Sequence, residues 1–280
     1  MRRPPRSATD SRRQFLKRAA ATLGVAGLTS TAGCLGDVRD NVSPPATAIG
    51  GTSAIAETAL SKDAFDAYAT RQREQYGDHG IWGAADSEPE HDLEFVGAWT
   101  RTIGVTADGS PAPQPEGPGD LRAVADSVVA AYEIPDRSTE EKQHYQLWLW
   151  AAGRLPGEAD DGPVAATPGL RRVEIGVELT GGDAEMGAYT PGSDHSRGPV
   201  TVGPASPDVD GLAASVPLET GQIRVVPDRT GFDKNAYAVA WTGDHDGQQA
   251  VAATCETAWD GDSAPQFELS VRLAADRRRL

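Results

Sequence analysis

The chain has 280 residues, which is enough for one large domain or two small ones, and it is strongly acidic. It holds 26 Lys and Arg residues against 41 Asp and Glu, for a formal net charge of −15 at pH 7. The first 33 residues are basic, so the segment from Cys34 onward holds 19 basic and 40 acidic residues. Such a surface repels phosphates, and we therefore expect no nucleic-acid partner.

Lysine is scarce in the acidic segment, where three lysines stand against sixteen arginines. This composition resembles that of proteins from extreme halophiles such as haloarchaea. In molar salt the Debye length is only about 3 Å, so a dense negative surface repels itself weakly and stays hydrated. The alternative is an ordinary acidic secreted protein, but the low lysine content favours the halophile interpretation.

A paired-arginine motif opens the chain. Residues 11–17 read Ser-Arg-Arg-Gln-Phe-Leu-Lys, and a mild apolar run follows at 19–33. This run is shorter than the roughly 20 residues that cross a bilayer. The segment resembles a twin-arginine leader, which implies that residues 1–33 are a signal peptide and that the translocase of that route exports the folded protein. The residues that carry the resemblance are Arg12, Arg13, Phe15 and Leu16.

The leader ends in Thr31-Ala32-Gly33-Cys34, which resembles the lipobox of bacterial and archaeal lipoproteins. Thr31 departs from the aliphatic residue usual at that position, and simple cleavage or an uncleaved anchor are the alternatives. The resemblance implies a lipid on Cys34, the membrane as partner and a location at the outer face of the cell membrane. Cys255 is then the only remaining thiol, so no internal disulfide can form.

Residues 34–58 are predicted to be a lipidated cysteine and a flexible tether, because they contain Pro44-Pro45 and Gly50-Gly51 and show little periodicity. The remainder, 59–280, is predicted to be a single extracytoplasmic domain.

Two helices are predicted in the first half of this domain. The first begins after Ser61, which can cap it, and ends at Gly77. The second runs from Asp120 to Pro135, and its apolar stripe consists of Leu121, Val124, Ala125, Val128 and Tyr132.

The rest of the domain is predicted to be strand. Alternating apolar residues indicate strands at 93–105, 145–150, 173–179, 237–241, 251–259 and 267–273. Asp246-Gly247 indicates a hairpin turn between the fourth and fifth of these. The segment 145–152 also fits a helix with a capping box at Ser138 and Glu141, but we favour a strand with two apolar faces. The pattern predicts an α+β, mainly β fold, either a single antiparallel sheet or a β-sandwich with two helices.

Three histidines follow an aspartate in glycine-bearing loops: His79, His195 and His245. Imidazoles backed by carboxylates are a common metal-binding arrangement, so these three are candidate metal ligands. Turn chemistry alone also accounts for Asp and Gly at these places. Ser193, Asp194 and His195 are adjacent, but triad members come from separate elements and the nucleophile-elbow pattern is absent.

A blue-copper site is excluded, because Cys255 is followed by neither histidine nor methionine and the only Met after the leader is Met186. We expect no cofactor. Cys255 shares strand parity with Val251 and Trp259, which indicates a buried thiol. Trp148 and Trp150 are a candidate stacking platform for a planar ligand, with burial as the alternative.

Two functions follow as hypotheses. The first is a non-catalytic binding or envelope-structural domain. The second is a secreted hydrolase or metal-dependent enzyme that uses the Asp-His loops, and it requires a pocket where at least two of the three histidines converge.

We expect the domain from Cys34 onward to unfold when salt is removed, because its net charge of −21 is then no longer screened. Circular dichroism and thermal unfolding in molar and in tens-of-millimolar KCl measure this. An unchanged spectrum and melting temperature at low salt contradict the halophile interpretation.

Overall fold

The computed structural model describes residues 46–52, 59–81, 93–106, 111–112, 121–155, 166–181, 184–204, 213–260 and 265–279. All of these belong to one compact unit, Arg39–Leu280. The leader and Cys34 lie outside the described residues.

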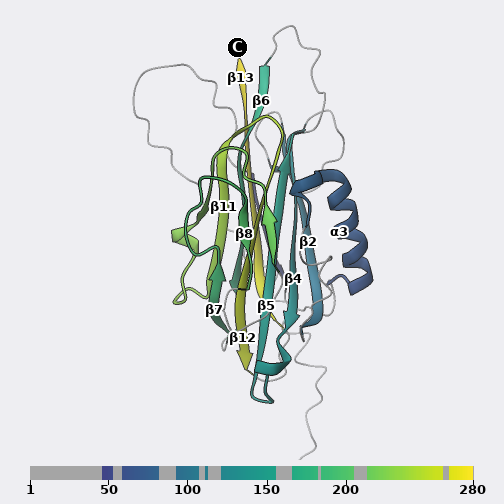
Figure 1. The fold of residues 1–280 in the computed structure, drawn as a ribbon, viewed down its shortest axis with the longest axis vertical. Coiled ribbons are helices and arrows are strands. Elements are labelled where there is room, and N and C mark those ends of the chain that lie inside the picture. Colours follow the sequence, from purple (N-terminus) through teal and green to yellow (C-terminus); the bar gives the residue numbers. More distant parts are fainter. Residues whose placement is uncertain are drawn as a thin grey trace, which may run out of the picture. The chain divides into compact units, whose positions relative to one another are not determined.

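The described chain is mainly β, with three antiparallel sheets (Figure 1). The five-stranded sheet has the order β1 (Ala46–Thr52), β13 (Phe267–Arg279), β6 (Ala166–Leu179), β11 (Ala236–His245) and β10 (Gln222–Val225). The six-stranded sheet has the order β3 (Pro111–Ala112), β2 (Glu94–Thr106), β4 (Leu121–Glu133), β5 (Lys142–Arg154), β12 (Gln248–Asp260) and β7 (Glu185–Thr190). A short pair consists of β8 (Val200–Val202) and β9 (Ala214–Val216). The helical elements are α3 (Lys62–Tyr76) and the 3-10 turns η1 (Gly77–His79), η3 (Pro135–Arg137) and η4 (Pro227–Arg229).

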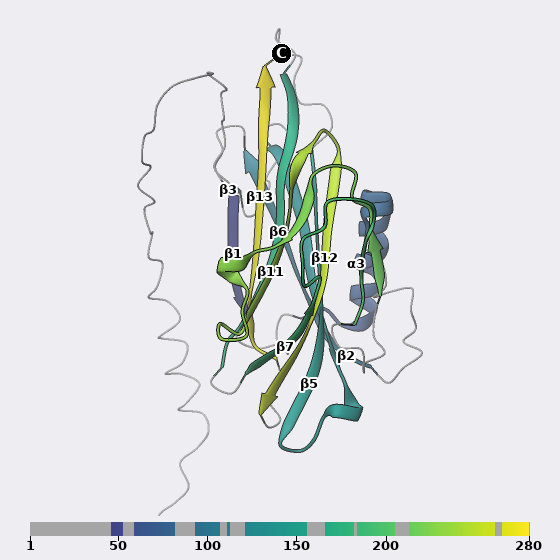
Figure 2. The same ribbon diagram turned by 60° about the vertical axis from the view of Figure 1, so that its left-hand side comes forward.

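The two larger sheets pack face to face around one hydrophobic core (Figure 2). Trp99 of β2 and Phe267 of β13 meet edge to face across it, with ring centroids 5.0 Å apart. Gly153 of β5 lies directly against the facing sheet, since a Cβ atom there would lie 2.6 Å from Cγ2 of Val173 on β6. The expectation of a mainly β domain with antiparallel pairing is confirmed; of the two architectures expected, a single sheet or a β-sandwich, the single sheet is wrong.

The helix α3 covers the outer face of the six-stranded sheet (Figure 2). Its predicted ends are confirmed: the Ser61 hydroxyl accepts from the backbone N–H of Ala64, and Gly77 closes the helix with φ 53°. The Tyr76 hydroxyl donates to Asp126 of β4 at 2.8 Å and thereby ties the helix to the sheet. The residues that α3 buries are Phe65, Tyr68, Ala69, Gln72 and Tyr76.

The second predicted helix is wrong, because residues 121–133 form β4, an inner strand between β2 and β5. Both faces of β4 are covered, so even Asp126 and Ser127 are buried and the sequence lacks the alternation of a half-exposed strand. Its apolar residues fit a helical stripe by coincidence. Antiparallel pairing with β2 and β5, the strands before and after it in the chain, determines that this segment is a strand.

Other predicted strands are confirmed, and strand pairing accounts for three further differences between the predicted and the observed elements. The predicted strand at 145–150 is confirmed as part of β5. The strand at 93–105 is confirmed as part of β2, but a bulge between Phe95 and Gly97 turns Phe95 to the helix side while Trp99 faces the core. The Asp246-Gly247 turn joins strands of different sheets, so β11 and β12 do not form the predicted hairpin. Part of the predicted tether, 46–52, is β1 and pairs with β13.

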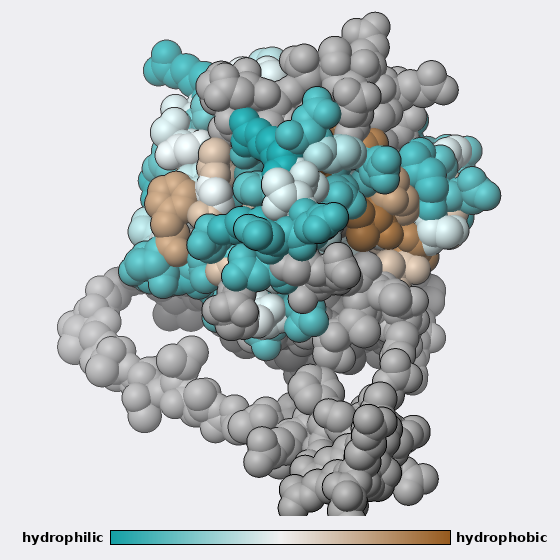
Figure 3. Space-filling view, turned by 90° about the horizontal axis from the view of Figure 1, so that it is seen from below, coloured by the Kyte–Doolittle hydropathy of each residue, from teal (hydrophilic) through white to brown (hydrophobic). Residues whose placement is uncertain are grey.

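Hydrophilic residues cover most of the described surface seen in Figure 3, with hydrophobic residues in a few patches. Phe232 is the large hydrophobic side chain that is exposed among the described residues, and it packs against Tyr189. Within the same residues, no helix combines the length and apolar character needed to cross a membrane.

Candidate functional site

The first of the Asp-His loops is docked firmly on the six-stranded sheet. His79 lies in η1, directly after α3, and only 4% of it is exposed. Its carbonyl accepts from the Trp150 indole at 3.0 Å, and its Nδ1 accepts from the backbone N–H of Ala250 at 3.4 Å. The Gln248 side chain donates to the Tyr76 carbonyl at 2.7 Å. The position of His79 is therefore set by β5 and β12, far away in the sequence.

Glu219 brings two of the three predicted histidines together. Its carboxylate oxygens lie 3.9 Å from Nε2 of His79 and 3.9 Å from Nε2 of His245, the last residue of β11. On the other side of His245, Nδ1 lies 4.0 Å from Asp246. Glu219 is 58% exposed, so this His79–Glu219–His245 cluster opens to solvent on the carboxylate side.

The loop that carries Glu219 is fixed from both ends. The Gln249 side chain donates to the Pro217 carbonyl at 2.7 Å, and the Trp241 indole donates to the Thr220 carbonyl at 2.7 Å. The Thr220 hydroxyl donates to the Asp244 carbonyl at 3.1 Å, next to His245. Sequence reasoning missed Glu219 because nothing local marks it; only the folded chain places its loop between the histidines.

The hydrogen bond from the Ala250 backbone N–H determines the tautomer of His79 and therefore its capacity to bind a metal ion. Because Nδ1 accepts an N–H, the proton of the neutral imidazole lies on Nε2, which then faces Glu219 as a donor and offers no lone pair to a metal ion. Burial lowers the pKa of His79 and the nearby Glu219 carboxylate opposes that shift, while His245 adds to it. The described residues contain no group of three or more His, Cys, Asp or Glu side chains placed to hold a metal.

His195, the third candidate ligand, lies elsewhere. Its backbone pairs with Ile223 of β10 at the edge of the five-stranded sheet. The neighbouring Asp194 carboxylate lies 3.7 Å from Arg224. His195 and Asp194 therefore take part in an edge strand contact and an ion pair, respectively.

The remaining candidates are inside the protein. Trp148 and Trp150 have no exposed surface, which is the burial given as the alternative to a stacking platform. Cys255 is also fully buried, and burial raises the pKa of its thiol well above the usual range, with Glu256 adding to the effect. A thiol held protonated in this way is a core side chain rather than a nucleophile. Arg12, Arg13, Phe15, Leu16 and Cys34 lie outside the described residues.

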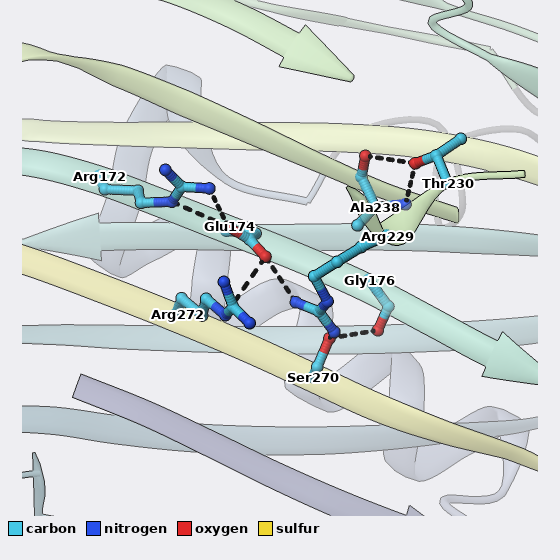
Figure 4. A network of polar contacts seen from close by, with 8 residues as sticks. All are labelled: Arg172, Glu174, Gly176, Arg229, Thr230, Ala238, Ser270 and Arg272. Atoms are coloured by element: carbon cyan, nitrogen blue, oxygen red, sulfur yellow. Dashed lines mark hydrogen bonds and ion pairs between the residues drawn. The ribbon is translucent and has the colours of Figure 1, made fainter. Parts of the chain in front are cut away.

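A second polar cluster was missed by sequence reasoning (Figure 4). Glu174 on β6 has no exposed side-chain surface although it faces away from the core between the two sheets. Arg172 on the same strand donates Nε to Oε2 at 2.8 Å and adds a second bond from Nη2. Arg229 of η4 donates to Oε1 at 2.5 Å and also to the Ser270 hydroxyl. Arg272 of β13 places Nε 3.5 Å from Oε1. The alternation of 173–179 predicted the inward residues of this strand but gave no sign that Glu174 is buried.

Comparison with known proteins leaves the family open. No protein-family model matches the chain, and no curated protein matches it. Among solved structures, one described as "Pore forming protein" aligns with a TM-score of 0.38 and 9% identity, over 67% of this chain and 94% of that one. A similarity this distant gives no basis for assigning a function.

We expect His79 to make the stability depend on pH. Its folded pKa lies below the ordinary value of about 6.5, so the unfolded chain binds the proton more readily. Stability therefore rises with pH between the folded and unfolded pKa values, and it is lost as pH falls below about 6.5. In urea unfolding at molar salt, the midpoint falls from pH 7 to pH 5, and it falls less in His79→Asn, whose amide oxygen can still accept from Ala250.

His144 is the matched comparison, because burial lowers its pKa as well. His144→Asn therefore removes a further part of the pH dependence, and the double variant removes more than either single change. A double variant as pH-sensitive as the wild type contradicts this assignment.

Proposed function

We propose that the chain is an exported protein, anchored by a lipid on Cys34 at the outer face of the cell membrane, whose β-rich domain has a non-catalytic binding or envelope-structural role. The proposed export and membrane location are based on the complete motif at 11–17, followed by the apolar run and the small residues before Cys34. The acidic, lysine-poor composition supports the further proposal that this domain functions in high salt.

The state of the reactive side chains supports a non-catalytic domain. The Cys255 thiol is buried and its pKa is raised, Trp148 is fully buried, and Trp150 contacts the Tyr76 ring of α3 and donates to the His79 carbonyl of η1. His79 uses its Nδ1 in a backbone hydrogen bond. The side chains that most often perform chemistry are therefore part of the packing, and the polar surface remains for recognition.

Cys34→Ser should release the protein into the medium, because the thioether lipid is its membrane attachment in this proposal. Fractionation of cells that express the full chain, with the protein quantified in membranes and in medium, measures this. Cys255→Ser is the matched control and should stay with the membranes. A Cys34→Ser variant that fractionates like the wild type overturns the anchoring part of the proposal.

The alternative is a secreted hydrolase, and the convergence of His79 and His245 on Glu219 favours it. In such an enzyme, His245, which is 15% exposed and flanked by Glu219 and Asp246, would be the general base for a water molecule. This arrangement does not need the metal that the sequence suggested.

Under the non-catalytic proposal, the wild type and Glu219→Gln turn over a panel of esters, glycosides and peptides at the same uncatalysed rate. His195→Asn, at the edge of the other sheet, serves as the control for nonspecific effects. A wild-type rate about tenfold or more above that of Glu219→Gln, with His195→Asn unaffected, would establish the hydrolase instead.

A further inference from the structure

We propose that Arg172, Arg229 and Arg272 form a binding site for a tetrahedral oxyanion, a phosphate or sulfate group, on the outer face of the five-stranded sheet. The site does not depend on the proposed export or anchoring. The three guanidinium groups come from two adjacent strands and from η4, and they converge on the same carboxylate (Figure 4).

Charge balance is the first argument. Arginine is always protonated, so three guanidinium groups around one carboxylate leave two positive charges uncompensated within the cluster. One arginine that binds a buried carboxylate through two hydrogen bonds is enough to neutralise its charge. The excess is unusual in a chain of net charge −15, and it matches the charge of a doubly ionised phosphate or of sulfate.

Hydrogen bonding gives the second argument. The oxygens of Glu174 are occupied by two donors from Arg172 and one from Arg229. Arg272 does not contribute a hydrogen bond to them: its Nε is buried without a hydrogen-bond partner, at 3.5 Å from Oε1. Glu174 therefore takes its hydrogen bonds from Arg172 and Arg229, while Arg272, its cross-strand neighbour, adds an ion pair without a hydrogen bond and keeps its donors for another acceptor.

Access is the third argument. The three side chains are 32%, 24% and 35% exposed for Arg172, Arg229 and Arg272, so part of each guanidinium faces solvent. The neighbouring strand β11 places Thr242 opposite Arg172, Ala240 opposite Glu174 and Ala238 opposite Gly176. Small residues on that side leave the guanidinium groups uncovered by the strand.

Two acidic groups of this face lie further along the strands. Glu178 and Glu268 pair with each other across β6 and β13, four residues along the strand from Glu174. That is about 13 Å, beyond the Debye length at any salt above about 0.1 M. Asp228 precedes Arg229 and is exposed. Planar guanidinium forks held by a buried carboxylate bind the several oxygens of a tetrahedral anion better than they bind chloride.

The test is a titration of the full chain, purified in detergent at molar KCl, with inorganic phosphate and with sulfate at constant ionic strength. We expect saturable binding of one anion by calorimetry and a rise in melting temperature. Arg272→Gln should weaken binding about tenfold or more while Glu174 keeps its three hydrogen bonds, and Arg272→Lys should give an intermediate affinity because it keeps charge without the fork.

Arg224→Gln is the matched control for charge on the same face, since Arg224 of β10 lies opposite Ala240, two strands from Glu174, and pairs with Asp194 rather than with Glu174. Its affinity should stay within about twofold of the wild type. Equal losses in Arg224→Gln and Arg272→Gln, or no saturable binding by the wild type, overturn the site. The wild-type result decides the matter even if a variant at Arg272 does not fold.

A second arm identifies the source of the anion. Short-chain phosphatidylglycerol or phosphatidylcholine is added to the micelles, and competition with phosphate is measured. Competition by the anionic lipid alone, lost in Arg272→Gln, assigns the site to a lipid headgroup. Phosphate binding without lipid competition assigns it to the free ion. Both results support the site, and neither depends on whether Cys34→Ser releases the protein from cells.

Discussion

The close contact between the two large sheets constrains the rest of the domain. At Gly153 the strands approach so closely that a Cβ atom would lie 2.6 Å from Val173 and 3.2 Å from Leu170 and Leu273. Inner strands packed in this way have two buried faces once the outer layer is added, so a buried carboxylate on them needs hydrogen-bond donors. Asp126 meets this condition through hydrogen bonds from α3 and β2, since Tyr76, Gln75 and Thr102 donate to it.

The outer layer links this packing to the candidate chemistry. The helix α3 and the β8–β9 pair cover the outer face of the six-stranded sheet, and the segments that follow each of them, η1 and residues 217–221, meet at the start of β12. His79 and Glu219 come together because these two segments dock on the same strand end. The cluster is thus a consequence of how the outer layer closes over the sheet, whether or not it also performs catalysis.

Electrostatics separates two kinds of charge in this protein. Exposed acidic groups repel one another, and in molar salt that repulsion is screened over about 3 Å. Buried contacts such as those of Glu174 with Arg172 and Arg229 are screened much less, because salt does not enter between the groups. High salt therefore relaxes the surface while it leaves this cluster intact, and the cluster's excess positive charge contrasts with the acidic chain around it.

The sequence alone determined what depends on neighbouring residues. Ser61 and Gly77 predicted the ends of α3, and strict alternation predicted β6 and β13, because caps and one-sided burial leave a local pattern. Only the tertiary structure decided that residues 121–133 are a strand, that the Asp246-Gly247 turn passes between sheets, and that Glu219 lies between two histidines. The physical reason is that sheet partners and side-chain neighbours are set by the folded chain. A strand buried on both faces, such as β4, need not keep the alternation of a half-exposed strand, and Glu219 meets histidines that local sequence does not place beside it.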